Sequence, residues 1–207
     1  YILRDDQSPL NAIKTGADSS ICGDCVHRGE NGKNRTCYVN IGQGVTVVYK
    51  AFIDGKYPLW DGAGINGRLV RLGTYGDPAA VPRAIWENFL RDAVGHTGYT
   101  HQWRRPEFSW LSRYCMASAD TVADSMHAQA LGFRTFRVAL PSHVKRVKAE
   151  AICPASEEAG KKLTCSTCLA CNGAGTGRKS SIVIQAHGGT AVMANIKRLD
   201  ASNTLAI

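Results

Sequence analysis

The chain has 207 residues, of which 44% are hydrophobic, and it carries a formal net charge of +8. This length and apolar content favour one soluble globular domain with its own core, and they exclude a small domain that needs a disulfide framework to fold. No run approaches the ~20 apolar residues of a membrane-spanning helix, so we expect no membrane contact and a reducing, intracellular setting.

The middle of the chain alternates between predicted helices and strands. Apolar patterns and turn residues predict strands at 69–74, 96–102, 114–117 and 134–140. Helices are predicted at 41–52, at 77–91 and from Ser118 or Asp120 to 131, with a short helical turn at 107–111. Two further strands are predicted at 149–153 and 182–185. This alternation predicts an α/β fold with a parallel sheet and right-handed crossovers.

We expect a single domain, 1–207, in which four segments differ in character. Residues 1–40 form an N-terminal cysteine segment, and residues 41–148 form the β/α core. Residues 149–180 form a C-terminal cysteine segment, and residues 181–207 form a terminal strand and tail.

The late cysteines have the spacing of a metal site. Of the eight cysteines in the chain, four are Cys153, Cys165, Cys168 and Cys171. The run Cys165-x2-Cys168-x2-Cys171 resembles the three-cysteine run of bacterial ferredoxins, and Cys153-Pro154 resembles the remote cysteine-proline that completes such sites. A 4Fe-4S cluster is therefore the leading interpretation for this group.

The early cysteines form an incomplete set. Cys22, Cys25 and Cys37 offer three sulfurs, and a second 4Fe-4S cluster or a zinc ion needs a further ligand. For zinc, His27 or Cys115 would be that ligand. Three interpretations stay open: one or two iron-sulfur clusters, zinc alone, and disulfides or free thiols.

Polar residues at the carboxyl ends of the predicted strands are candidates for binding a ligand. In parallel sheets these ends carry the working loops. Asp77, His101 and Gln102 stand there, and we expect Cys153 to share that face. Each has a structural alternative: Asp77 as a helix cap and His101 as a hydrogen-bonded structural histidine. Cys115, if not a ligand, is a buried inert thiol.

Three motifs together resemble a bacteriophage family called gene product eighty-eight, itself similar to a reduced radical S-adenosylmethionine (SAM) barrel. The first motif is Cys22-x2-Cys25-x11-Cys37-Tyr38. The second is the segment 71–77, in which a strand leads into a helix that starts at Gly-Asp, and the third is the late Cys-Pro with its cysteine run. The resemblance implies an open, partial β/α barrel of parallel strands with helices outside. It also implies a 4Fe-4S cofactor and a phage-encoded viral protein in the cytoplasm of the infected host cell.

The chain also departs from the radical SAM pattern. Those enzymes hold their cluster with a compact Cys-x3-Cys-x2-Cys loop, whereas Cys22, Cys25 and Cys37 are spread over sixteen positions. Gly188-Gly189 is followed by Thr190 and not by glutamate, and it lies late in the chain. The resemblance therefore does not carry SAM binding over to this sequence.

Two functions of different classes follow. The first is a phage iron-sulfur protein in redox or radical chemistry, with a host or phage protein as redox partner. The alternative is a zinc-stabilised module that binds nucleic acid or a host protein, as the net positive charge suggests. The basic residues are spread out, with one local cluster at 145–148, and a solvated face is the simpler interpretation of them. Hydrolysis at an open zinc site, with Asp24, Asp77 or His101 as base, is a third reading, but no His-Glu-x-x-His motif is present. The sequence assigns no catalytic residue and no substrate.

Overall fold

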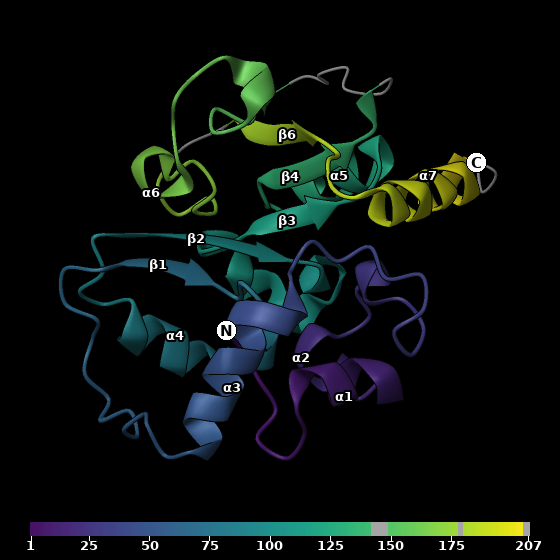
Figure 1. Ribbon diagram of the computed structural model, residues 1–207. Helices are drawn as coiled ribbons and strands as arrows, with labels where there is room; N and C mark the ends of the chain where they lie inside the picture. Colours follow the sequence, from purple (N-terminus) through teal and green to yellow (C-terminus); the bar gives the residue numbers. More distant parts are fainter. Residues whose placement is uncertain (142–148, 178–179, 205–207) are drawn as a thin grey trace.

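A six-stranded, all-parallel open sheet with flanking helices organises the chain (Figure 1). The structure is a computed structural model that describes residues 1–141, 149–177 and 180–204. The strands are β1 (Leu69–Leu72), β2 (Gly95–Thr100), β3 (Met116–Ala119), β4 (Thr135–Ala139), β5 (Glu150–Ile152) and β6 (Ser181–Gln185). Their order in the sheet is β1-β2-β3-β4-β6-β5, so β6 lies between β4 and β5. The predicted parallel α/β sheet is thus confirmed.

The helices lie before, between and after these strands. They are α1 (Pro9–Thr15), α2 (Ser19–Cys22), α3 (Thr46–Ile53), α4 (Arg83–Phe89), α5 (Val122–Ala130), α6 (Cys165–Cys168) and α7 (Thr190–Thr204). Short 3-10 helices cover Val26–Arg28, Pro78–Ala80, Gln102–Arg104, Pro106–Arg113 and Glu157–Ala159. A kinked turn, Ile41–Val45, leads into α3. No helix in the described part of the chain is long and apolar enough to span a membrane.

Two predicted elements differ from the structure for local reasons. The helix predicted at 77–91 is interrupted, because Pro82 lacks a backbone donor and Val81 before it is extended; α4 begins only at Arg83. The third strand begins at Met116, two residues later than predicted. Cys115 still belongs to the preceding helical turn, since its backbone N–H donates to the carbonyl oxygen of Leu111 at 2.7 Å.

The two faces of the sheet pack against different layers. Met116 and Ala117 are neighbours in β3 and point to opposite faces. Ala117 joins a core cluster with Trp86 of α4 and Ala128 of α5, so the helices cover its face. Met116 joins Cys153 and other buried residues of the late cysteine segment. Cys153 and Cys171 of the late group therefore pack on the face opposite to α4 and α5.

The last two strands are joined to the sheet by a buried ion pair. Arg137 of β4 donates from Nε and Nη2 to the two carboxylate oxygens of Glu150 of β5, at 2.9 and 2.7 Å. Both side chains are almost fully shielded from water, at 3% and 0% exposed. Ser125 of α5 also donates to Glu150 at 3.3 Å. This network joins α5, β4 and β5 on the helix-covered face.

Replacing one partner of this pair should destabilise the fold. We expect Arg137→Met to lower the free energy of unfolding by about 3 kcal/mol, because the buried carboxylate of Glu150 loses two hydrogen bonds from a guanidinium. Urea unfolding measures the change. The double variant Arg137→Met with Glu150→Leu should recover most of the loss, and Arg83→Met, in the exposed Arg83–Glu87 pair, is the matched control with little effect. Equal stability of Arg137→Met and the wild-type chain would contradict this prediction.

Candidate metal centres

The four late cysteines gather on one face of the sheet. Cys153 and Cys171 are buried in the same cluster with Met116. Burial raises the pKa of the Cys171 thiol to about 12, with smaller contributions from charge at Cys153 and Cys165. Burial also raises the pKa of Cys153, and charge at Cys165 and Cys168 adds to this effect. The late cysteines are therefore near enough to one another for their charges to interact.

A buried arginine holds the loop that carries these cysteines. The guanidinium of Arg134, just before β4, donates to the backbone oxygens of Ala170, Gly173 and Ser180 at 2.9, 2.8 and 2.6 Å. It also donates to the side-chain oxygen of Asn172 at 3.3 Å. Its positive charge acts against the burial that raises the pKa of Cys171. Arg134 therefore both shapes the loop and favours negative charge on it.

Contacts to the starts of the strands place this loop at the amino ends of the sheet. The backbone N–H of Gly98 in β2 donates to the carbonyl oxygen of Cys171 at 2.9 Å. Figure 1 shows α6 beside the strand starts, away from the arrowheads. We expected Cys153 to share the carboxyl-end face with Asp77 and His101. Cys153 directly follows β5, at the carboxyl end of that strand, and it packs in the buried cluster that also contains Met116 and Cys171.

The early cysteines lie at the opposite, carboxyl ends of the strands. Cys22 is the last residue of α2, and Cys25 and Cys37 follow in a loop in which the backbone N–H of Cys37 donates to the oxygen of His27 at 2.9 Å. Burial raises the pKa of the Cys22 thiol to about 12, and charges at Asp18, Cys25 and Cys37 add to this. The three thiols therefore lie near enough to one another for their charges to interact.

Hydrogen bonds dock this early segment on the strand ends. Gln102, after β2, donates from its side-chain nitrogen to Asp24 at 2.7 Å and to the carbonyl oxygen of Cys22 at 3.4 Å. The backbone N–H of Asp77 donates to the oxygen of Ile21 at 2.6 Å. Gln102 thus positions the cysteine segment through the carboxylate of Asp24 and the backbone oxygen of Cys22.

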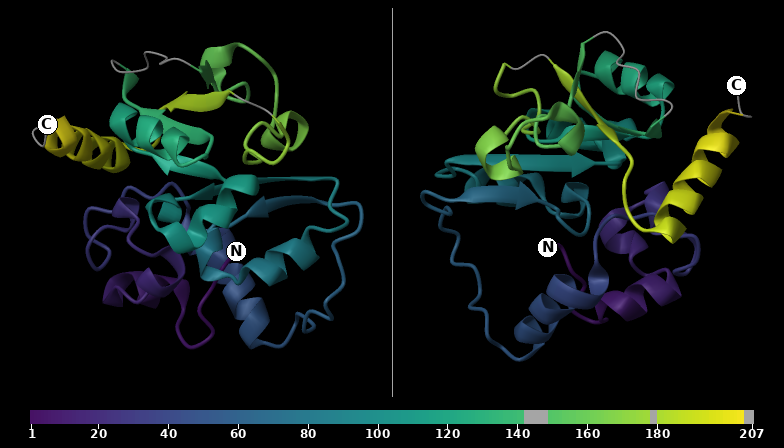
Figure 2. Two further views of the ribbon diagram at one scale, coloured as in Figure 1. Left: turned by 180° about the vertical axis from the view of Figure 1, so that it is seen from behind. Right: turned by 45° about the horizontal axis from the view of Figure 1, so that its top comes forward.

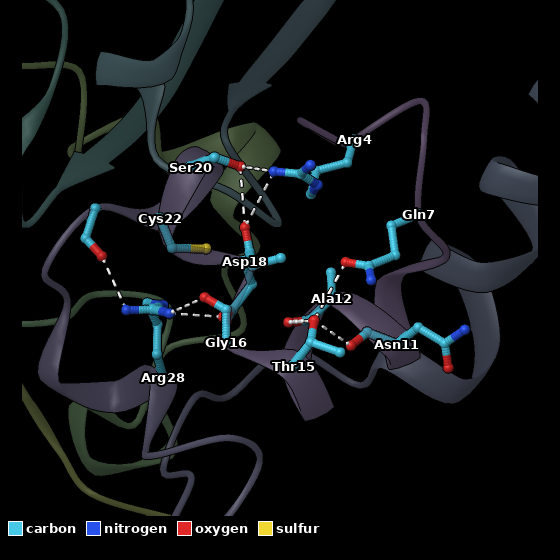
Figure 3. Close-up of polar contacts among 12 residues, drawn as sticks. Arg4, Gln7, Asn11, Ala12, Thr15, Gly16, Asp18, Ser20, Cys22 and Arg28 are labelled. Carbon is cyan, nitrogen blue, oxygen red and sulfur yellow. Dashed lines mark hydrogen bonds and ion pairs between the residues drawn. The ribbon is translucent and has the colours of Figure 1, made fainter.

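A second arginine fixes the turn before Cys22. Figure 3 shows Arg28 pointing at Gly16 and Asp18, next to the Cys22 side chain. Its Nη2 donates to the carbonyl oxygen of Gly16 at 2.9 Å and to Asp18 at 2.7 Å, and its Nη1 donates to the oxygen of Gly23 at 3.1 Å. The hydrogen bond with Asp18 raises the pKa of Arg28. The turns on both sides of Cys22 are therefore fixed.

Asp77 has a structural role in the strand ends. Its carboxylate caps the turn that follows β1 by accepting from the backbone N–H of Ala79 at 3.0 Å. It also accepts from the hydroxyl of Thr100 and from the backbone N–H of His101, each at 2.8 Å. Burial raises the pKa of Asp77, whereas these hydrogen bonds lower it. Both carboxylate oxygens are used, as the capping interpretation predicts.

His101 brings together residues that are far apart in sequence. Its Nδ1 lies 3.4 Å from the sulfur of Cys25, and its Nε2 lies 3.9 Å from Asp120. His27 contacts the same carboxylate at 2.8 Å. The sequence pattern predicts Ser118 or Asp120 as the cap of the helix that follows β3. Thr121 is the actual cap of α5, and its hydroxyl accepts from the backbone N–H of Asp124 at 3.0 Å. Asp120 is therefore free to contact the histidines.

Cys115 lies outside both cysteine groups. It is 0% exposed and packs in the core with Leu72 and Trp103 on the helix-covered face. Burial raises the pKa of its thiol, and charge at Asp77 adds to this. The structure therefore places Cys115 as a core residue.

Thiol reactivity should report this difference in burial. In the metal-free chain we expect iodoacetamide to modify the exposed Cys165 at least about 10-fold faster than Cys171 or Cys115, whose burial raises the pKa and blocks access. Peptide mass spectrometry after a timed pulse measures the order. In denaturant all eight cysteines should react alike. Equal rates for Cys165 and Cys171 in the folded chain would contradict the late site.

A glycine in the late loop offers a second test. At Gly173 φ is +71°, and an added Cβ would lie 2.6 Å from the carbonyl oxygen of Arg113. Gly177 has a similar φ of +73° but open space around it. Both Gly→Ala variants should lose roughly 1 kcal/mol of folding stability, because alanine disfavours a left-handed backbone. Only the new Cβ of Gly173→Ala also clashes with a backbone atom. Thermal unfolding should show the greater loss for Gly173→Ala; equal losses would argue against the packed loop.

Searches among protein-family models, curated proteins and solved structures find no match to this chain. The resemblance to the phage family thus remains an expectation that rests on short sequence motifs.

Proposed function

We propose that this chain is an iron-sulfur protein whose late cysteines bind a 4Fe-4S cluster. One observation carries the proposal: Cys153 and Cys171 are buried in one cluster, and charge at Cys165 reaches both of them. Arg134 holds the loop that carries Cys171. Four soft thiolates suit iron-sulfur clusters or zinc. When bound, a cluster supplies one-electron transfer.

The described cysteines are not grouped as tightly as a single zinc ion requires. Tetrahedral zinc with Zn–S bonds of about 2.3 Å holds its sulfurs about 4 Å apart. Within the described residues, the groups of three or more His, Cys, Asp or Glu ligand atoms that lie within 4.8 Å of one another include no cysteine set. A cluster spaces its ligands more widely, because each cysteine binds a different iron.

The early group supports a second, catalytic or redox cluster in the same proposal. Cys22, Cys25 and Cys37 are neighbours, and Cys115 is packed elsewhere in the core. We assign these three as the cysteine ligands and leave one iron without a cysteine. The group lies at the carboxyl ends of the strands, where parallel sheets hold their active sites. Redox or radical chemistry at this edge is the activity that we propose.

The finer expectations from the phage resemblance belong to this proposal too. Strands β1 to β4 follow chain order, as in a β/α barrel, and the sheet is open, which suits a partial barrel. The exchange of β5 and β6 departs from barrel order. A phage-encoded protein that acts in the cytoplasm of the infected host, with a host or phage redox partner, is consistent with these features.

Metal and sulfide content test the proposal. We expect anaerobically purified chain to be brown, with about eight irons and eight sulfides for two 4Fe-4S clusters. Cys165→Ser should lose about half of the iron, and Cys22→Ser should lose the other half, because each removes a ligand of only one cluster. Cys115→Ser is the matched control and should keep all of it, since its sulfur lies in the core.

Two outcomes would overturn this reading. Colourless protein with stoichiometric zinc and no sulfide would reject the clusters and favour the zinc-stabilised binding module. Iron loss in a well-folded Cys115→Ser variant would show that the core thiol is a ligand. About four irons, lost in Cys165→Ser alone, would restrict the proposal to the late site and reject the early cluster.

A further inference from the structure

Three residues with metal-binding side chains meet at the carboxyl ends of β2 and β3. His101 directly follows β2, Asp120 directly follows β3, and His27 comes from the N-terminal segment that covers these ends. One ligand atom from each lies within 4.8 Å of the other two. The group uses no cysteine, so it is distinct from both cysteine sites.

Both imidazoles are oriented as in metal-binding histidines. Nδ1 of His27 is paired with the hydroxyl of Thr36 at 2.5 Å, and Nδ1 of His101 is paired with the sulfur of Cys25 at 3.4 Å. In each ring Nε2 faces Asp120, at 2.8 Å from His27 and 3.9 Å from His101. A histidine that binds a metal through one nitrogen usually has the other held by such an outer partner.

One of these nitrogens is left unsatisfied. Nε2 of His101 is buried, and at 3.9 Å from Asp120 it is too far for a hydrogen bond. A buried polar atom without a partner is costly. A purely structural ion pair between His27 and Asp120 would not account for this third group. A metal ion bound by all three residues would satisfy it.

A cavity of about 540 Å³ opens beside the three residues. Asp24, Arg104, Thr121 and Leu140 contribute to its wall, together with the three residues themselves. This volume is in the range of small-molecule sites. An ion held here would therefore keep open positions that small ligands reach from the cavity.

We propose that His27, His101 and Asp120 bind one divalent transition-metal ion of the iron(II) or zinc class. Two histidines and one carboxylate hold such ions with open coordination positions, as in non-haem iron and catalytic zinc sites. The ion would be additional to the clusters proposed above. Because it has no cysteine ligand, its loss and the loss of a cluster are measured separately.

Cobalt(II) is the probe for this site. We expect the cluster-loaded full chain, kept anaerobic, to bind one further Co²⁺, seen by weak d–d absorption and by calorimetry. Asp120→Asn and His27→Gln should each weaken this binding at least about 10-fold, because each removes one of three ligands. His127→Gln is the matched control, since His127 is exposed on α5 and its ring packs against Trp103.

Iron, sulfide and circular dichroism, measured on the same samples, show whether the clusters and the fold persist in each variant. No additional Co²⁺ in the wild-type chain would overturn the proposal, and this result does not depend on any variant folding. An intense thiolate-to-cobalt charge-transfer band would also overturn it, by placing the ion on cysteine. Undiminished Co²⁺ binding in the folded Asp120→Asn and His27→Gln variants would overturn the proposal as well. Co²⁺ binding in a chain without iron and sulfide would reject the clusters and support this site.

Discussion

The buried carboxylate of Asp77 is the interaction on which the carboxyl edge of the sheet depends. A carboxylate away from water needs hydrogen-bond donors, and here they come from Ala79, Thr100 and His101. These bonds tie the end of β1 to the end of β2. The backbone of Asp77 also holds Ile21, next to Cys22. The side chain of Asp77 therefore sets the strand ends and the backbone of His101, and its main chain holds the early cysteine segment.

Repulsion between neighbouring thiolates must be balanced in both cysteine groups, which lie toward opposite ends of the strands. Bringing several thiolates together in a partly buried site is unfavourable without cations or hydrogen-bond donors, as the raised pKa values of Cys22 and Cys171 show. Arg134 provides a positive charge at the late group, and Arg35 does so near Cys37. Each arginine also donates to backbone oxygens of its own loop. The shape and the charge balance of each site therefore depend on the same residue.

The sequence predicts those features that local patterns determine. Alternating strands and helices predict the parallel sheet, and the close spacing of the cysteines predicts that they gather in two groups. The break at Pro82 was readable from the residue itself. The start of β3 was not readable from the sequence, because Tyr114 and Cys115 have strand-forming neighbours. In the structure the helical turn that ends at Arg113 continues past it, since the backbone N–H of Cys115 donates to the oxygen of Leu111. Nor does any local pattern predict that β6 inserts between β4 and β5.

The contact of His27 with Asp120 joins residues 93 positions apart, and only the folded sheet brings them together. Burial opposes the charge on Asp120, yet the two histidines lower its pKa below the usual range. His101 in turn reaches Cys25, so one imidazole lies between the carboxylate and a proposed cluster ligand. Hydrogen bonds to ligand sulfurs are one of the factors that set a cluster's reduction potential. With both proposed sites occupied, a change at the ion would therefore act on the early cluster through His101, whereas the late cluster, at the amino ends of the strands, has no such contact within the described residues.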